Sequence, residues 1–405
     1  MTSILFAILL LATPGQAAPL EPAPVAEPPA DPVLQALQAE LDRATSALST
    51  KDLPPYFIGL EAIEIRTLRI HGEEGGLQGY GPNDARWIHA DVRVGDAALD
   101  STHPLRDYGW DDAPPAGREM GLGDDPDVLQ AAVWREIDAR YRVAADRFQR
   151  VLSDQQLLVD EDLGFDLAPE TPTEHLGAVA TLENLDLADW EGTARAASAV
   201  FATSDVTFDA GVTMIAEAET RWFVSSEGHR QRHGAVRLRV LVQGDTLADD
   251  GDGLVLARTF DAATPQGLPS REAVVAAAEE VQRTLLALKA APLEEPYRGP
   301  AILSGRASAV FFHEIFGHRV EGHRLRLVDD AQTFRQQVGQ SILPSFLSVV
   351  DDPTQKQLAG EDLRGHYLFD DQGVAAQPAV LVRDGVLEGF LESRAPVQSL
   401  TSNGH

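Results

Sequence analysis

The sequence contains no cysteine and only three lysines among its 405 residues. Without cysteine the chain forms no disulfide and has no thiolate to bind a metal or carry a lipid. Acidic residues outnumber basic ones by 63 to 33, which gives a net charge of −30, and the basic residues form no cluster. We therefore expect no nucleic-acid partner, and the charge favours cationic ligands and divalent metals.

Long hydrophobic runs are also missing. The longest run is the nine residues Ile4 to Ala12, and a membrane-spanning helix needs about 20, so we expect no membrane span. Small residues follow this run, as in a secretory signal peptide. We predict a signal peptide over 1–17, cleaved near Ala17, which would make the protein exported (periplasmic or extracellular). The alternative is an N-terminal helix packed into the domain. The proline-rich stretch 18–32 predicts a stiff linker.

The rest of the sequence predicts an α+β fold. We expect an N-terminal α/β domain over 33–200, with long helices on a mostly antiparallel sheet, and a middle α/β region over 201–298. A β-rich and incomplete C-terminal region follows over 299–405. Hydrophobic periodicity predicts helices near 33–53, 127–152, 189–201, 270–289 and 306–321, and strands near 57–68, 87–93, 206–224, 235–242, 254–260, 301–303, 379–382 and 386–391.

Two local signals are sharper than the periodicity. Ser270 precedes a predicted helix and can accept a hydrogen bond from a free amide of its first turn. Asp384 and Gly385 lie between two short predicted strands, and this dipeptide favours a type I′ hairpin turn because glycine tolerates a positive φ. A further glycine-rich stretch over 75–81 predicts a turn between two longer strands.

Residues 313–318 read His-Glu-Ile-Phe-Gly-His. Two imidazoles can bind a metal ion, and a glutamate beside them can take a proton from water, so this run contains the parts of a hydrolytic metal site. The alternative without a metal site is a surface helix whose histidine and glutamate side chains are only solvated. The histidines are five residues apart, whereas the familiar zinc-peptidase motif separates them by four.

On an ideal helix this spacing places His318 roughly 140° from His313. Convergence then needs either a π-bulge or a metal lying over the groove where Gly317 exposes backbone. A rival arrangement uses Glu314, His318 and Glu321 as the metal face, which would make Glu314 a ligand and not a base. In either case we expect Phe312, Ile315, Phe316 and Val320 to form the buried side of this helix.

The wider run from Phe311 to His323, preceded by Tyr-Arg-Gly-Pro at 297–300, resembles the TldD/PmbA family of metallopeptidases. Further similar stretches are 91–96, 226–228, 365–373 and 393–405. The motif is more similar to the catalytic TldD-type subunit than to the PmbA-type partner.

The resemblance implies a zinc-dependent peptidase that hydrolyses small or unfolded peptides. It implies one Zn²⁺ per chain, held by His313 and His318, with Glu314 as the general base. It also implies a homo- or heterodimer with a TldD/PmbA-type subunit, in which substrates bind as extended strands.

The resemblance further implies a cysteine as the third zinc ligand, and this chain has none. It also ends at His405, where relatives continue, so we expect a C-terminally truncated member or a fragment. Substitutes for the third ligand are Glu321, His323 and His366, which the sequence does not rank. The alternative function is a catalytically inactive peptide-binding or partner subunit of the same fold.

Overall fold

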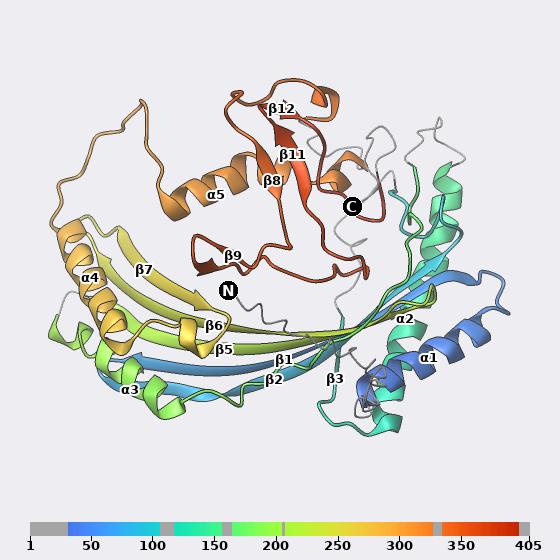
Figure 1. Cartoon of the computed structure of the whole chain (residues 1–405), viewed down its shortest axis with the longest axis horizontal. Coiled ribbons are helices and arrows are strands. Elements are labelled where there is room, and N and C mark those ends of the chain that lie inside the picture. The colour runs from blue at the N-terminus through green and yellow to red at the C-terminus, as the bar shows by residue number, and fades with distance from the viewer. Residues whose placement is uncertain (1–30, 106–116, 156–163, 205–206, 327–333, 397–405) are drawn as a thin grey trace, which may run out of the picture. The chain divides into compact units, whose positions relative to one another are not determined.

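A computed structural model describes residues 31–105, 117–155, 164–204, 207–326 and 334–396. The predicted signal peptide and nearly all of the predicted linker lie outside these residues. From Pro32 onward the chain forms one compact unit, dominated by a seven-stranded sheet (Figure 1). Its strands are β1 (Pro55–Glu73), β2 (Gly76–Val94), β3 (Arg118–Met120), β4 (Glu174–Leu176), β5 (Phe208–Ser225), β6 (Arg230–Leu247) and β7 (Gly253–Ala262). Strands from both the 33–200 and the 201–298 regions share this sheet, and the domain boundaries remain a prediction.

The sheet runs in the order β3-β2-β1-β5-β6, and β6 pairs with both β7 and β4. Only β4 pairs in parallel; the other pairs are antiparallel. The β1–β2 hairpin turns at Glu74 and Gly75, whose φ angles of 49° and 82° are those of a type I′ turn. This turn is shorter than the one predicted over 75–81, because strand β2 already begins at Gly76.

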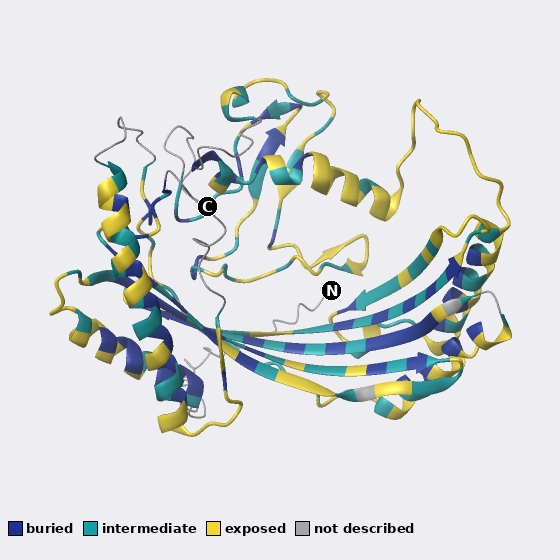
Figure 2. Cartoon of the chain, turned by 180° about the vertical axis from the view of Figure 1, so that it is seen from behind, coloured by how far each residue is buried: buried dark blue, intermediate teal, exposed yellow. Residues whose placement is uncertain are grey.

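Four helices pack on one face of the sheet: α1 (Pro32–Leu48), α2 (Pro126–Gln155), α3 (Leu187–Ser198) and α4 (Arg271–Lys289). Alternate strand residues point to this face. Figure 1 shows α1 and α2 near one end of the sheet and α3 and α4 near the other, and Figure 2 shows the buried residues between helices and strands. The strand residues of the two cores include Leu60, Ala62, Trp222 and Val224 under α1 and α2, and Ile70, Met214, Leu238 and Val240 under α3 and α4.

The opposite face of the sheet is polar and contacts the C-terminal region. Arg364 donates to Asp261 at 2.9 Å, and Asp371 accepts from Arg221 at 2.8 Å. Arg221 also donates to Glu61 on β1 at 3.1 Å. Burial raises the pKa of Glu61 to about 7, although the positive charge of Arg221 opposes this rise. The face therefore contains a carboxyl group that titrates near neutral pH.

We expect Glu61→Gln to flatten the pH dependence of stability. The folded pKa of about 7 lies above the usual value of 4.5, so folding favours the protonated form. The stability from this preference is complete below about pH 4.5 and is lost as pH rises through 7. Urea denaturation at pH 5 and pH 8 should show the wild type losing about 1–3 kcal/mol more than the variant over this range. Equal losses in the two proteins would contradict the assignment.

The C-terminal region contains helix α5 (Gly305–Ile315) and a small sheet in the order β12-β11-β8. Asp384 and Gly385 form the predicted turn between β11 and β12, with φ angles of 48° and 82°. Phe316, Val320, Leu381, Leu387 and Phe390 belong to its core. The remaining elements of the chain are β8 (Val349–Asp351), β9 (Gln357–Leu358), β10 (Glu361–Asp362), β11 (Ala379–Arg383) and β12 (Val386–Leu387), with the 3₁₀ turns η2 (Phe201–Thr203), η3 (Pro265–Gly267), η4 (Gly317–Arg319), η5 (Gly322–Arg326) and η6 (Arg335–Gln337).

The α+β class is confirmed by this mixture of helices and mainly antiparallel strands. Four local predictions were wrong. Residues 301–303 form no strand, and the helix predicted to reach Glu321 ends at Ile315. The helix predicted near 33–53 ends at Leu48, and the strand predicted near 386–391 ends at Leu387. Among the described residues, no helix is both long and apolar enough to cross a membrane.

Candidate metal centre

Helix α5 breaks inside the His-Glu-Ile-Phe-Gly-His run. The amide of Phe316 still donates to Phe312 O at 3.0 Å, as in an α-helix, but Arg319 N donates to Phe316 O at 2.9 Å, three residues back. Phe316 takes φ −123° and ψ −51°, outside helical geometry. His318 therefore lies on the 3₁₀ turn η4, and its direction does not follow the wheel of a continuous helix. The two histidines can therefore approach each other without a π-bulge and without a metal lying over the groove of a continuous helix.

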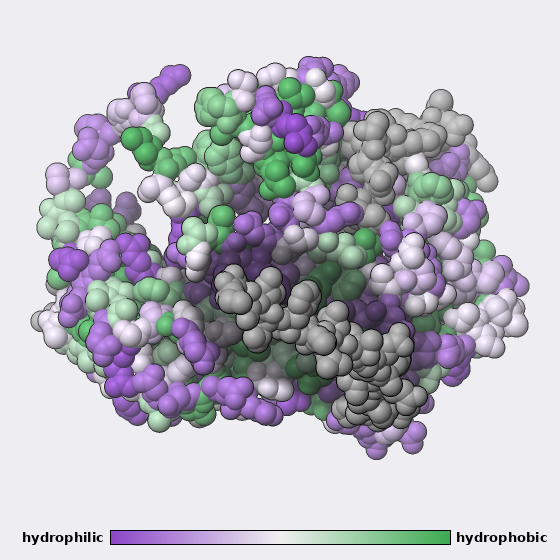
Figure 3. All heavy atoms as spheres, in the orientation of Figure 1, coloured by the Kyte–Doolittle hydropathy of each residue, from purple (hydrophilic) through white to green (hydrophobic). Residues whose placement is uncertain are grey.

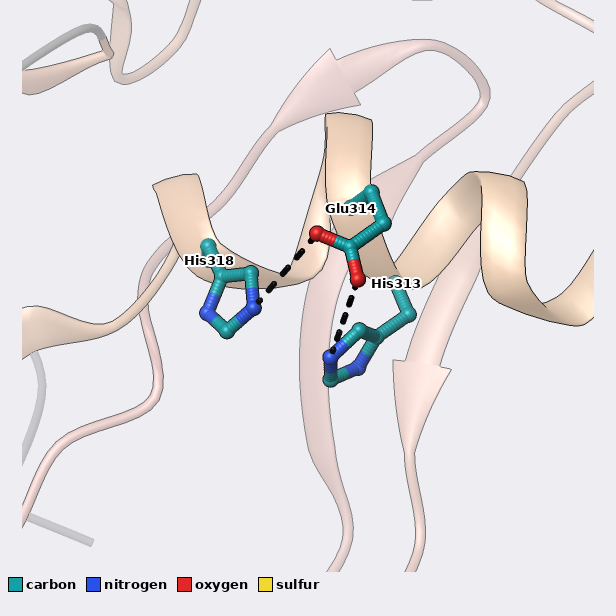
Figure 4. Close-up of side chains that lie close together, drawn as sticks. All are labelled: His313, Glu314 and His318. Atoms are coloured by element: carbon teal, nitrogen blue, oxygen red, sulfur yellow. Dashed lines mark ion pairs between the residues drawn. The ribbon is translucent and has the colours of Figure 1, made fainter.

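The break brings the three predicted side chains together (Figure 4). Glu314 lies between the two imidazoles, with one carboxylate oxygen 3.9 Å from His313 Nε2 and the other 3.9 Å from His318 Nε2. The ring centroids of the two histidines are 4.6 Å apart. One ligand atom from each residue lies within 4.8 Å of the others. Among the described residues, these three side chains form a group that could hold a metal ion.

The donor set fits a zinc ion chemically. Zinc binds imidazole nitrogen at about 2.0–2.1 Å, so neighbouring ligand atoms around it lie roughly 3.3 Å apart. The candidate ligand atoms of the three side chains lie within 4.8 Å of one another. The side chains of His313 and Glu314 are 63% and 62% exposed, so side-chain rotations can bring the ligand atoms closer together. A peptide can reach the site because it is open to solvent.

The two histidines are supported differently. His318 Nδ1 lies 2.7 Å from Glu321 Oε1, and Arg324 Nε donates to Glu321 Oε2 at 2.6 Å. Burial pushes the pKa of Glu321 upward, but the hydrogen bonds from Arg324 and His318 outweigh it and lower this pKa. In the part of the chain that the structure describes, the ring of His313 has no hydrogen-bond partner. His318 is therefore the better fixed of the two imidazoles.

The segment after His318 is attached to the C-terminal core. Val320 is buried, and the amide of Leu391 donates to its carbonyl at 2.7 Å. The amide of Gly322 in turn donates to Leu391 O at 2.6 Å, so Glu321 sits in a short parallel bridge with Leu391. By contrast α5 has no buried residue. The His318 side of the site is thus anchored to the fold, and the His313 side projects from an exposed helix.

We expect Gly322→Ala to loosen this anchor. A Cβ at position 322 would lie 2.6 Å from Leu391 O, too close for any real contact, so the bridge must separate. The variant should have a lower urea midpoint and weaker zinc binding than the wild type. Gly317→Ala is the matched control, because its Cβ would meet its nearest neighbours, His313 Nδ1 and Phe312 O, at an ordinary 3.9 Å. Equal stability of the two variants would contradict this expectation.

The other candidate ligands do not join the group. Glu321 contacts the Nδ1 edge of His318, whereas Glu314 lies on the Nε2 side, so the structure does not form the rival metal face. His366 Nδ1 lies 2.9 Å from Pro353 O, and His323 Nε2 lies 3.9 Å from Glu321. From the sequence, Glu321 was predicted only as a candidate metal ligand, and its contact with His318 was not predicted. The available signal was the i, i+3 spacing, which a 3₁₀ turn brings onto one face.

The predicted buried side of the motif helix is only half correct. Phe316 and Val320 are buried, but Phe312 and Ile315 are 38% and 41% exposed. Figure 3 shows hydrophobic residues gathered over α5 and the segment before it. The exposed hydrophobic residues of this surface, which we call the α5 patch, are Ile302, Leu303, Val310, Phe311, Phe312 and Ile315.

Comparisons with known proteins cover the same region. Residues 296–405 match the family described as PmbA/TldA metallopeptidase C-terminal domain. A metalloprotease of Archaeoglobus fulgidus is 32% identical over 99 residues, 24% of this chain and 21% of the relative. A metalloprotease TldD homolog of Haemophilus influenzae is 31% identical over 136 residues, 33% of this chain and 27% of the relative. These alignments thus span about a quarter of the curated relatives.

The fold extends the similarity beyond the C-terminal region. The crystal structure of TldE from Thermococcus kodakarensis superposes with a TM-score of 0.55 at 14% identity. The superposition covers 91% of this chain and 73% of TldE. At this identity the likeness concerns the fold, and the C-terminal sequence matches supply the relationship. Residues 296–405 thus match the TldD/PmbA family in sequence, and the fold as a whole resembles that of TldE.

Proposed function

We propose that this protein is a zinc-dependent peptidase acting on small or unfolded peptides. The observation that carries the proposal is the position of Glu314 between two imidazoles, 3.9 Å from the Nε2 atom of each. The similarity of residues 296–405 to a metallopeptidase C-terminal domain supports it. His313 and His318 would hold one Zn²⁺ per chain through Nε2.

The residues of the motif then have distinct roles. Zinc, when bound, supplies the Lewis acidity that makes water a nucleophile at neutral pH and polarises the peptide carbonyl. Glu314 takes the proton of the attacking water on a carboxylate oxygen and delivers it to the departing amine nitrogen. Each of its oxygens lies 3.9 Å from one histidine, so the carboxylate lies beside both imidazoles that would hold the ion.

A catalytic zinc site normally has three protein ligands, and two imidazoles supply two of them. In the described part of the chain, Glu314 is the further donor grouped with both imidazoles. If it binds the metal, another group must act as base. This alternative is distinguished from the proposal by whether zinc remains when Glu314 loses its charge.

The partner we propose is a second TldD/PmbA-type subunit, which would form a homo- or heterodimer. The α5 patch supports this, because monomeric soluble proteins rarely leave large apolar patches uncovered. Strand addition would bind peptides through main-chain hydrogen bonds with little sequence preference.

We also propose that the protein is exported, because the apolar run at Ile4 to Ala12 is typical of a signal peptide.

The direct test measures zinc content and peptide cleavage by the purified protein. We expect about one zinc per chain, and loss of both zinc and cleavage in His313→Ala and His318→Ala. One bound zinc without turnover of any unfolded peptide would favour the alternative of an inactive peptide-binding or partner subunit. Absence of bound zinc at saturating concentration would refute the metal site.

A further inference from the structure

The Glu321 contact determines which nitrogen of His318 carries the proton. A carboxylate has only lone pairs and can only accept a hydrogen bond. Arg324 donates to Glu321 and helps to keep it ionised. In the 2.7 Å contact between His318 Nδ1 and Glu321 Oε1, the hydrogen must therefore lie on Nδ1. In the neutral ring this leaves the lone pair on Nε2, the atom that faces Glu314.

We propose that Glu321 is a positioning residue of the metal centre: it fixes His318 in the Nδ1–H tautomer and aims the Nε2 lone pair at the metal. This inference rests on the proposed function, since it assumes that His318 binds the ion. A carboxylate behind a ligand imidazole also makes the imidazole a better donor and restricts its rotation.

Glu321 is suited to this role by its attachment to the fold. Its backbone pairs with Leu391, and its neighbour Val320 is buried in the C-terminal core. Arg324 holds the second carboxylate oxygen at 2.6 Å, so both oxygens are engaged. The side chain is 27% exposed, against 62% for Glu314. Because Glu321 is attached to the core, its contact with His318 restricts the motion of a ring that is itself 43% exposed.

His313 has no comparable support among the described residues, so the two ligands should respond differently. His318 is held in position before the metal arrives, and His313 adjusts on the exposed helix α5. For Glu321 to bind the metal itself it would have to leave both His318 and Arg324. The contacts therefore favour positioning over direct ligation.

The tautomer can be measured without any metal. Long-range ¹H–¹⁵N spectra of histidine-labelled, metal-free protein above the imidazole pKa distinguish Nδ1–H from Nε2–H rings. The His318 signal is assigned by its loss in His318→Asn. We expect Nδ1–H in the wild type and a shift toward Nε2–H in Glu321→Ala. An Nε2–H ring in the wild type would overturn the proposal, whatever the activity of the protein.

Zinc affinity provides the second measurement. In competition with a chromophoric chelator, Glu321→Ala and Glu321→Gln should bind zinc about 10–100-fold more weakly than the wild type. Glu279→Gln, on the exposed side of α4, is the matched control and should bind as the wild type does. Circular dichroism checks that each variant is folded.

The two proposals fail in different ways. Wild-type zinc affinity in Glu321→Gln, together with zinc loss in His318→Ala, would overturn the positioning role and leave the metal site intact. Unchanged zinc binding in His313→Ala and His318→Ala would instead refute the metal site, and the tautomer measurement would still decide whether Glu321 controls the His318 ring.

Discussion

Replacing Glu314 with glutamine should lower peptide cleavage by about 10²–10⁴-fold and leave about one zinc per chain. The amide has the size of the carboxylate but cannot take a proton from water. Its side chain is 62% exposed, so the fold should not respond. The experiment compares kcat for an unfolded peptide and zinc content by elemental analysis in the two proteins.

Glu279→Gln serves again as the control, because it makes the same change of charge on α4, away from the motif. Two results would contradict the assigned role of Glu314. Unchanged cleavage would exclude it as the base. Loss of zinc together with activity would identify it as a ligand, which corresponds to its role in the rival arrangement considered from the sequence.

Much of the fold could be predicted because its signals are local. Ser270 accepts from the amide of Ala273 at the start of α4, as its position before a periodic segment indicated. Asp384 and Gly385 form the predicted turn because the two residues themselves tolerate positive φ. The long strands of the sheet alternate between a face covered by helices and a polar face, and this alternation is visible in the sequence.

The end of α5 could not be predicted because its cause is distant. Residues 306–321 have helical periodicity, yet no residue of α5 is buried. Phe316 and Val320 instead enter a core with Leu381 and Leu387. Reaching that core requires the chain to tighten at Gly317, and the position of the core depends on a sheet formed some 60 residues later. A helical wheel assumes a continuous helix and misplaces His318.

The pairing of buried charges was also invisible in the sequence. Arg394 and Glu227 are 167 residues apart along the chain, yet both terminal nitrogens of the guanidinium donate to the carboxylate at 2.7 Å. Neither residue has a local pattern that identifies the other.

Arg394→Ala should destabilise the protein by about 3 kcal/mol. The Arg394 side chain is fully buried, donates to Ala168 O at 2.9 and 2.7 Å, and lies over the ring of Phe57. Its removal leaves the Ala168 carbonyl and the Glu227 carboxylate without these donors. Glu227 is 27% exposed, which places the expected cost at the lower end of the range for a broken buried pair. Urea denaturation measures the change.

The control is Arg383→Ala, which removes an exposed pair with Glu388 from the same C-terminal region and should change stability little. Arg394→Lys should fall between the two, since lysine keeps the charge but not the two-pronged geometry. A loss in Arg394→Ala no larger than in Arg383→Ala would show that the buried pair does not stabilise the fold.

Arg394→Ala should also weaken zinc binding at the candidate metal site. Arg394 follows Leu391 by three residues, and Leu391 forms the bridge that holds Val320 and Gly322 beside the motif. Without the Arg394 side chain, the segment that carries Leu391 keeps its backbone hydrogen bond from Ala168 N to Arg394 O but loses the side-chain bonds to Ala168 O and Glu227. Zinc affinity should therefore fall in Arg394→Ala at urea-free equilibrium, and remain unchanged in Arg383→Ala. A stability loss with unaltered zinc affinity would mean that the motif is positioned by α5 and the local core alone.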